Sequence, residues 1–333
     1  MKTRIFIFSD GELKRKENTL FFENEKGEKK FIPVEGTQEL MLFGEVTLNK
    51  RFLEFATQRE IILHFFNHYG YYIGSFYPRE HLNSGYMILK QAEVYLSMER
   101  RIELARKFVG GAISNISKVL DYYARRKGSD SVQQICSRIK ELESSLPSQN
   151  ASDSLMAIEG NVRNMYYSAF DEIIGDENFK FEGRTKRPPK NRINALISFG
   201  NSLLYTTVLS EIYKTHLDPR IGFLHSTNFR RFSLNLDVAE IFKPIFVDRM
   251  ILSLINKGEL KGAHFEKRMD GVIMNEEGKK TFVKEFEDRL HKTIKHKKIG
   301  KPVSNRRLIR LELYKLEKHI MGEEEYKPFI WEW

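Results

Sequence analysis

The chain has 333 residues, of which 41% are hydrophobic and 12% aromatic, so it can form one large folded domain or two smaller ones and is not a disordered chain. Its 55 basic and 45 acidic side chains give a formal net charge of +10, which favours a polyanionic partner such as nucleic acid, although a soluble protein that is merely basic has the same balance. Because the chain has one cysteine and no apolar run long enough for a signal peptide or a bilayer span, we expect a cytoplasmic protein without an internal disulfide and without membrane contact.

The first 80 residues predict β structure. Short apolar or β-branched runs follow one another there, separated by glycine and asparagine residues. The predicted strands are 5–8, 19–23, 30–34, 39–43, 61–66 and 71–76. Residues 49–59 have their apolar side chains at helical spacing and predict one short helix. We therefore predict a small N-terminal β domain over residues 1–80, which ends near Pro78.

From about residue 85 the apolar spacing becomes helical. A long basic helix is predicted first, with a break at residues 127–129, and the helical spacing around Cys136 favours a buried thiol over a nucleophile. Further helices are predicted from residue 157, over 191–214 and over 233–256, the last one kinked at Pro244. The predicted fold class is thus α+β, with the small β domain followed by a larger all-α-helical domain over residues 85–333.

Three segments of the helical domain carry side chains suited to chemistry. Glu159 lies beside the apolar stripe of a predicted helix, where an acidic first-turn residue favoured by the helix dipole is the simpler explanation. His225 follows a short apolar run, as ordinary core histidines do. Asp237 and Glu240 share one face of a strongly apolar helix and are expected to be partly buried, although solvated pairs of this kind are common.

Together these carboxylates and the imidazole predict a site for Mg²⁺ or Mn²⁺ rather than structural zinc, which favours thiolates and histidines. Such a cation next to a phosphodiester polarises the phosphoryl oxygen and orients the attacking hydroxyl. The chain lacks a Walker P-loop, a GxGxxG motif, zinc-ligand spacing and a GxSxG elbow, which disfavours nucleotide-driven, redox and serine-hydrolase chemistry.

Basic side chains gather in two places where they are suited to bind a phosphate backbone. The first is a proline-containing loop with Arg184, Lys186, Arg187 and Lys190. The second is a C-terminal cluster made of Lys292, Lys295, Lys297, Lys298, Lys301, Arg306, Arg307 and Arg310.

Five segments, in order along nearly the whole chain, resemble the CRISPR-associated integrase and endonuclease family of the adaptation module, the "Cas one" protein. They are Phe65-Phe66-Asn67 with residues 70–76; Ile158-Glu159-Gly160 with Arg163 and Tyr167; Arg187-Pro188-Pro189 with residues 194–200; residues 217–225, which end at His225; and residues 233–244, followed by Val247-Asp248-Arg249.

The resemblance implies roles for individual residues. Its metal ligands are Glu159, His225 and Glu240, with Asp237 as a further catalytic residue beside them and Tyr205 near the scissile phosphate. Arg163 and Lys243 join the basic loop as residues expected to bind nucleic acid. The sequence departs from the family pattern at two positions. Glu240 stands where many members have aspartate, and Lys243 stands where arginine is usual, which keeps the charge but loses bidentate phosphate binding.

The resemblance also implies a reaction and partners. A 3′ hydroxyl of a short foreign DNA attacks a phosphodiester at the edge of a CRISPR repeat, so that a new spacer is inserted by transesterification, and water at the same site gives a nuclease. The expected substrate is double-stranded and branched DNA, and the expected cofactor is Mg²⁺ or Mn²⁺. The expected partners are a second copy, in a homodimer to which the β domain contributes, and the small ferredoxin-like "Cas two" adaptation protein.

Two other functions remain open at the level of the sequence. A stand-alone, structure-specific DNA nuclease in repair shares the site but lacks the small partner, so copurification separates it from the integrase. A non-catalytic nucleic-acid-binding scaffold requires only the charge and the helices, and it predicts that Glu159, His225 and Glu240 lie far apart in the fold.

Overall fold

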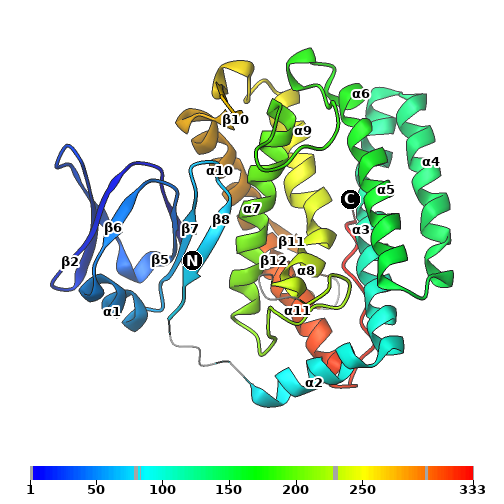
Figure 1. The fold of residues 1–333 in the computed structure, drawn as a ribbon, viewed down its shortest axis with the longest axis horizontal. Coiled ribbons are helices and arrows are strands. Elements are labelled where there is room, and N and C mark those ends of the chain that lie inside the picture. The colour runs from blue at the N-terminus through cyan, green and yellow to red at the C-terminus, as the bar shows by residue number, and fades with distance from the viewer. Residues whose placement is uncertain (1–2, 79–81, 83, 228–231, 297–298, 333) are drawn as a thin grey trace. The chain divides into compact units, whose positions relative to one another are not determined.

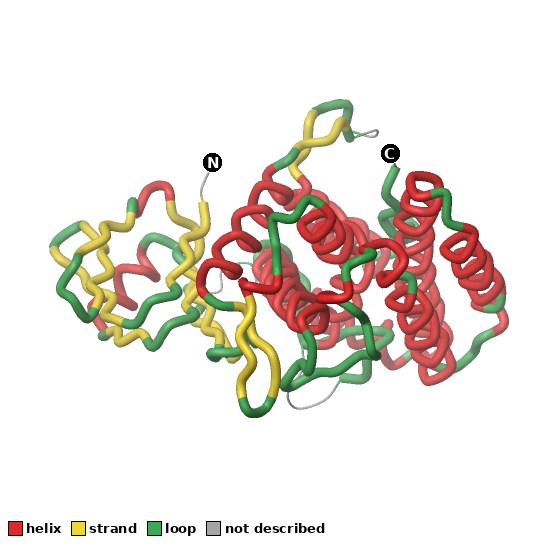
Figure 2. The backbone as a smooth tube through the Cα atoms, turned by 90° about the horizontal axis from the view of Figure 1, so that it is seen from above, coloured by secondary structure: helices red, strands yellow, loops and turns green. Residues whose placement is uncertain are grey.

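The computed structural model describes residues 3–78, 82, 84–227, 232–296 and 299–332 (Figure 1). The chain divides into two compact units, Met1–His81 and Leu82–Trp333. The first unit consists of strands with one helix, and the second is mostly helical, so the predicted fold class is confirmed (Figure 2). No described helix is long and apolar enough to cross a membrane.

The N-terminal unit contains two four-stranded sheets. One has the order β1 (Thr3–Ile7), β5 (Thr37–Leu42), β7 (Ile62–Phe66) and β8 (Tyr72–Phe76), in which β8 alone is antiparallel to its neighbour. The other has the order β4 (Lys29–Ile32), β3 (Thr19–Asn24), β2 (Gly11–Lys16) and β6 (Val46–Leu48). The predicted strands are present, but β2 and β6 were not predicted. Strand β2 has one buried side chain, Leu13, among charged ones, and β6 is only three residues long.

Helix α1 (Lys50–Gln58) connects β6 to β7, and the Asn49 side chain caps it by accepting a hydrogen bond from the Phe52 amide at 3.1 Å. Its buried side chains meet alternate residues of both sheets in one apolar core. That core contains Ile7, Leu13, Leu20, Phe22, Ile32, Leu40, Leu42, Phe52, Phe55, Ala56, Ile61 and Leu63.

Ten helices are described in the C-terminal unit. They are α2 (Gly85–Leu96), α3 (Met98–Lys127), α4 (Asp130–Ser144), α5 (Ser152–Ser168), α6 (Phe170–Ile174), α7 (Arg192–Ile212), α8 (Ser233–Lys243), α9 (Arg249–Asn256), α10 (Glu276–His291) and α11 (Asn305–Ile320). Helix α3 packs against α4, α5 and α8, while α7 packs against α8 and α11 and is buried along most of its length. A π-helical turn, Pro244–Asp248, joins α8 to α9, which confirms the predicted irregularity at Pro244.

Two short hairpins interrupt the helices of this unit, and the sequence did not predict them. They pair β9 (Phe265–Arg268) with β10 (Gly271–Met274), and β11 (Thr293–Lys295) with β12 (Pro302–Ser304). Each strand has three or four residues, which is too short for an alternating pattern to stand out among the surrounding charges.

Candidate functional site

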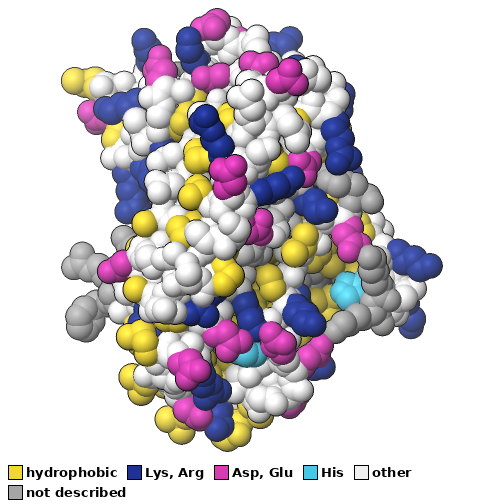
Figure 3. Space-filling model, turned by 90° about the vertical axis from the view of Figure 1, so that its right-hand side faces the viewer, with side chains coloured by type: hydrophobic (Ala, Val, Ile, Leu, Met, Phe, Trp, Pro, Cys, Tyr) yellow, Lys and Arg dark blue, Asp and Glu magenta, His cyan; other side chains and the backbone are white. Residues whose placement is uncertain are grey.

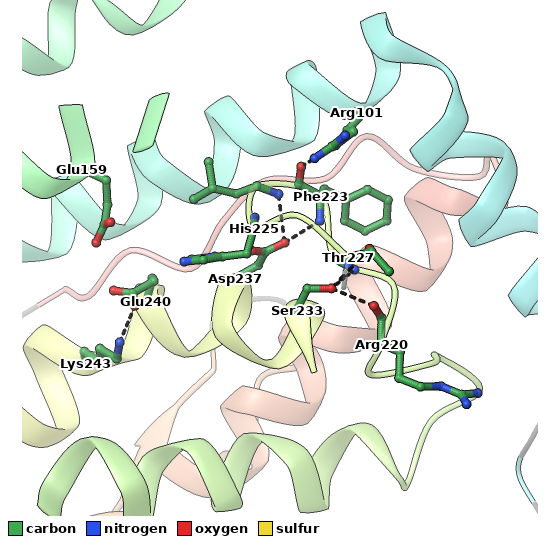
Figure 4. A network of polar contacts seen from close by, with 12 residues as sticks. Arg101, Glu159, Arg220, Phe223, His225, Thr227, Ser233, Asp237, Glu240 and Lys243 are labelled. Atoms are coloured by element: carbon green, nitrogen blue, oxygen red, sulfur yellow. Dashed lines mark hydrogen bonds and ion pairs between the residues drawn. The ribbon is translucent and has the colours of Figure 1, made fainter. Parts of the chain in front are cut away.

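The carboxylate of Asp237 on α8 holds His225 in place (Figure 4). Its Oδ2 accepts hydrogen bonds from the Phe223 and Leu224 amides at 2.5 and 3.0 Å, and its Oδ1 accepts one from the His225 amide at 3.0 Å. The His225 ring places Nδ1 2.8 Å from the same Oδ1. A neutral ring that donates its Nδ1–H to this carboxylate presents the lone pair of Nε2, which is the usual arrangement of a metal-binding histidine.

Two further contacts fix the loop that carries His225. Gly222 lies so close to the start of α8 that an added Cβ would approach the Ser233 carbonyl carbon to 2.5 Å and Asp237 Oδ2 to 2.8 Å. Arg101, from the first turn of α3, donates from Nε to the Phe223 carbonyl at 2.9 Å. The loop that carries the imidazole is therefore held by both α8 and α3.

Two carboxylates face the histidine from different helices. Glu159 comes from α5 and Glu240 from α8, and Figure 4 shows their carboxylates and the His225 ring directed toward a common space. Glu159 lies in the middle of α5, which begins at Ser152, so the predicted position in a first helical turn is wrong and the helix dipole does not explain it. The segments that the sequence selected, far apart along the chain, thus meet in the fold.

Two cations lie against these carboxylates. The Arg163 guanidinium pairs with both Glu159 and Glu240, and the Lys243 ammonium pairs with the other oxygen of Glu240. All four side chains are at most 16% exposed. Positive charge from the chain itself therefore neutralises the carboxylate pair.

Burial and charge act together on the protonation of this cluster. Burial alone would raise the pKa of Glu159, but Arg163, Lys243 and His225 outweigh it and hold the pKa below its usual range. Burial, together with the positive charge of Arg163, lowers the pKa of Lys243 to about 7. Glu159 is therefore ionised at neutral pH and available as an oxygen ligand.

Asp248, in the π-helical turn, is a residue to which the sequence gave no role. Its carboxylate is fully buried with no hydrogen bond to either oxygen, and burial raises its pKa to about 7 although Arg163 and Lys243 oppose this. The Val247-Asp248-Arg249 motif was a signal for it, but spacing alone could not indicate that it faces the cations of α5 and α8.

The donor set fits a divalent cation. Glu240 Oε2 is buried against the Arg163 guanidinium, so positive charge already lies where a cation would bind this carboxylate. Two carboxylates and one imidazole nitrogen suit Mg²⁺ or Mn²⁺. Arg163 lies between the two carboxylates. In this arrangement, no group of three His, Cys, Asp or Glu side chains in the described part of the chain is close enough together to hold a metal ion. Asp237 is not a candidate ligand, because its two oxygens already bind the histidine loop.

The residues expected to bind nucleic acid separate into two groups. Arg163 and Lys243 are enclosed among the carboxylates, where they pair with Glu159 and Glu240, and their contact with nucleic acid stays a prediction. In the basic loop, Arg184 binds Asn194 at 2.9 Å and Ser198 at 3.1 Å, and Lys190 donates to the Asp270 carbonyl at 2.8 Å.

The other residues predicted for the site are exposed or half-buried. Lys186 and Arg187 are exposed. Partial desolvation and the nearby charges of Arg184 and Lys243 lower the pKa of Lys186. Tyr205 is half-buried on α7, where its carbonyl accepts a hydrogen bond from Asn235 at 3.0 Å.

The C-terminal basic cluster does not act as a unit. Arg306 and Arg310 bind the buried Glu211 of α7, each at 2.7 Å from Nε, which removes them from the predicted DNA-binding cluster. Lys297 and Lys298 lie outside the described residues.

The family model of CRISPR associated protein Cas1 matches residues 5–288 of the chain. A relative from Thermodesulfovibrio yellowstonii, "CRISPR-associated endonuclease Cas1 2", is 63% identical over 333 residues, which is 100% of both chains. The solved structure of a Cas1 protein from Thermotoga maritima has 50% sequence identity and a TM-score of 0.88, and the match covers 98% of this chain and 99% of that chain.

More distant solved structures share the fold. A structure described as "Casposase bound to integration product" has 20% identity and a TM-score of 0.89, covering 100% of this chain and 95% of that chain. A chain of a "Cas6-RT-Cas1--Cas2 complex" has 19% identity and a TM-score of 0.84, covering 99% of this chain and 36% of that chain. The family model and the full-length relatives together establish that this chain belongs to the Cas1 family of CRISPR-associated proteins.

Proposed function

We propose that this chain is a divalent-metal-dependent DNA endonuclease and integrase that inserts new spacers into a CRISPR array by transesterification. The observation that carries the proposal is the imidazole of His225, which Asp237 orients so that its free nitrogen faces Glu159 and Glu240 (Figure 4). The names of its relatives, which are endonucleases, agree with this assignment. So does the casposase with the same fold, which is bound to an integration product.

Each side chain of the site has a role in this reaction. Glu159, His225 Nε2 and Glu240 would hold Mg²⁺ or Mn²⁺, and the ion when bound supplies polarisation of the phosphodiester and stabilisation of the leaving oxygen. Asp237 fixes the tautomer and orientation of His225 and is a positioning residue. Arg163 and Lys243, which neutralise the carboxylates here, supply positive charge beside a phosphate.

The proposed assembly is a homodimer that works with a small Cas2 partner on double-stranded and branched DNA. A solved complex that contains a chain of this fold together with Cas2 supports the partner. Lys186 and Arg187 are exposed, and Lys186 is close enough to Lys243 and Arg163 to interact with their charges, which supports a phosphate-binding role for the basic loop.

The test uses Glu159→Ala and His225→Ala in the full chain, with Glu141→Ala as a matched control, because Glu141 is an exposed carboxylate on α4. Strand transfer and cleavage of branched DNA are measured with Mg²⁺, with Mn²⁺ and with a chelator. Since a metal ligand contributes several kcal/mol to the transition state, we expect losses of roughly 10²–10³-fold in both variants and none in the control.

Mn²⁺ binding, followed by electron paramagnetic resonance, gives a second readout that does not depend on turnover. Full strand transfer by a folded Glu159→Ala variant would refute the site assignment. Cleavage without any strand transfer, even with the small partner present, would favour the stand-alone nuclease. DNA binding without either reaction would favour the scaffold.

A further inference from the structure

A cavity of about 460 Å³ lies beside the C-terminal half of α3. Its lining residues are Lys118, Asp121, Tyr122, Arg125 and Arg126, none of which belongs to the candidate metal site. The volume lies within the range of about 300–1,000 Å³ that is typical of ligand sites. Its lining contains three cations, one carboxylate and one aromatic ring.

The one carboxylate in the lining is already neutralised. Lys140 of α4 donates to both oxygens of Asp121, at 3.2 and 3.3 Å, and the Cys136 thiol donates to one of them at 3.1 Å. Lys118 and Arg125 are exposed, and among the residues that the structure describes no hydrogen bond or ion pair is recorded for either. The cavity therefore has an excess of positive charge.

Two guanidiniums contact the Tyr122 side chain, one from α3 itself and one from α9. Arg126 donates to the Tyr122 hydroxyl at 2.8 Å, and the Arg249 guanidinium of α9 lies over the Tyr122 ring, 5.4 Å from its centre. Burial lowers the pKa of Arg249 most, and the charge of Arg289 on α10 lowers it further. Arg289 is paired with Glu285, but the guanidiniums of Arg125 and Arg126 on α3 and of Arg249 on α9 are like charges that repel one another, and an anion in the cavity relieves that repulsion.

The helix dipole does not account for this cluster. Basic residues in the last turn of α3 interact favourably with its C-terminus, which explains Arg125 and Arg126. Lys118 lies more than one turn earlier, and Arg249 is on another helix. Over much of the face that α4 and α5 present, by contrast, basic and acidic side chains are interspersed (Figure 3).

We propose that this cavity binds phosphate groups of a DNA strand, as a contact site separate from Glu159, His225 and Glu240. The proposal rests on the proposed function, since a chain that acts on DNA has a polyanion at hand. Lysine and arginine side chains bind the phosphodiester backbone without reading its sequence, and they release counterions on binding. The exposed side chains of Lys118 and Arg125 would contact the phosphates beside Tyr122, whose hydroxyl and ring are held by Arg126 and Arg249.

The test compares two double charge reversals in the full chain. Lys118→Glu with Arg125→Glu changes the cavity, and Lys127→Glu with Arg138→Glu makes the same change in net charge at exposed positions outside its lining. Binding of fluorescein-labelled duplex and single-stranded DNA is measured by anisotropy in a chelator, from 50 to 200 mM salt, so that no catalysis enters. We expect the cavity pair to bind DNA at least about tenfold more weakly than the control pair. The plot of log K against log salt concentration should also be less steep by about two units of slope, because two phosphate contacts are lost.

Equal binding by the two pairs would overturn the proposal. A second result would also overturn it: inorganic pyrophosphate binds in a way that requires Lys118 and Arg125, while DNA binding does not require them. The cavity would then bind free phosphates and not DNA. If the wild-type chain binds DNA through the cavity but neither cleaves nor joins it with metal, the proposed function is refuted and this binding site is not. If the cavity variant shows normal strand transfer and normal DNA binding, this binding site is refuted and the proposed function is not.

Discussion

At the scale of single residues, Asp237 and Glu240 show how two carboxylates three positions apart take different roles. Asp237 is completely buried, and its oxygens satisfy three backbone amides and one ring nitrogen. Glu240 faces cations instead. The difference arises because the His225 loop lies over the start of α8 and leaves the next turn open.

Replacing Asp237 by asparagine should weaken both the loop and the histidine. The amide nitrogen cannot accept the hydrogen bonds that one carboxylate oxygen accepts, and an unsatisfied buried group costs about 1–3 kcal/mol. Loss of the partner that orients a metal-binding histidine should reduce metal affinity or activity by about 10–100-fold. Urea unfolding and Mn²⁺ binding measure the two effects separately.

Asp218→Asn is the matched control, because Asp218 is also a buried carboxylate of the same loop but pairs with Arg220. If both variants lost Mn²⁺ affinity equally, Asp237 would act only through the stability of the loop. A loss confined to Asp237→Asn, with the ¹⁵N shifts of His225 changed, is the outcome that a positioning residue predicts.

Gly222 is needed because the loop and α8 approach each other closely. An alanine side chain at this position would meet backbone atoms of Ser233 and Leu234 at 2.5 and 2.6 Å, and these atoms cannot rotate away. We expect Gly222→Ala to destabilise the chain by about 1–3 kcal/mol. Gly160→Ala is the control, since nothing lies within 4 Å of its added Cβ, and equal melting temperatures would show that the loop can shift freely.

The sequence contained the identity of the site residues but not all of their roles. Helical spacing placed Asp237 and Glu240 on one face. It did not indicate that the neighbouring loop binds the Asp237 carboxylate, whereas Glu240 pairs with a cation. Arg101 and Asp248 were not predicted as part of the site. Their partners lie on other helices, and no local pattern encodes a contact such as that between Arg101 and Phe223, which are 122 residues apart.

At the scale of elements, a buried ion cluster joins α7 to α11. Glu211 is fully buried and binds Arg306 and Arg310 of α11 and Lys214, which follows the end of α7. Burial of the Glu211 carboxyl opposes its ionisation, but Arg306, Lys214 and Arg310 outweigh burial and lower the pKa to about 2. The cluster is therefore charged throughout the physiological range.

Glu211→Gln should destabilise the protein by about 3–5 kcal/mol at neutral pH, because it leaves two guanidiniums near the core without their counter-charge. The folded-state pKa of Glu211 lies below the ordinary glutamate value of 4.5, so this stability is complete above about pH 4.5 and is lost as the pH falls toward about 2. Urea unfolding of wild type and variant at several pH values should show a difference that shrinks over that interval.

Glu276→Gln provides the comparison for this prediction. Glu276 pairs with Lys280 one turn away on α10 at 2.7 Å, and both side chains are exposed. Pairs of this kind contribute about 0–1 kcal/mol. A cost as large as that of Glu211→Gln would mean that burial does not distinguish the two ion pairs.

Elements with a strong period were predictable, and short or charged ones were not. Helix α7 and the π-helical turn at Pro244 followed from apolar spacing and from the missing amide of proline. Strand β2 and the hairpin strands β9 to β12 have few buried side chains, so their pairing depends on neighbours that spacing does not reveal. Arg306 and Arg310 looked like part of a DNA-binding cluster because sequence does not indicate which face of α11 meets α7.

At the scale of the C-terminal unit, the last residues described connect the helices that carry the site. Asn115 of α3 donates from Nδ2 to the carbonyls of Ile241 and Phe329, each at 2.9 Å, and accepts from the Trp331 amide at 2.8 Å. Phe329 stacks on Phe242 of α8 with ring centres 5.4 Å apart. One asparagine thus links α3, α8 and the C-terminal segment.

Deleting residues 328–333 should therefore loosen α8, the helix that supplies Asp237 and Glu240. The deletion removes the aromatic partners of Phe242 and Phe246 and two of the hydrogen bonds of Asn115, at a cost of about 2–4 kcal/mol. Hydrogen exchange should show faster opening of α8 amides than of α4 amides, since Phe329 of this segment stacks on Phe242 of α8, together with weaker Mn²⁺ binding. Glu332→Ala, at an exposed position of the same segment, should change neither quantity. If the deletion lowered global stability while α8 amides and Mn²⁺ affinity kept their wild-type values, the segment would stabilise the unit without supporting the site.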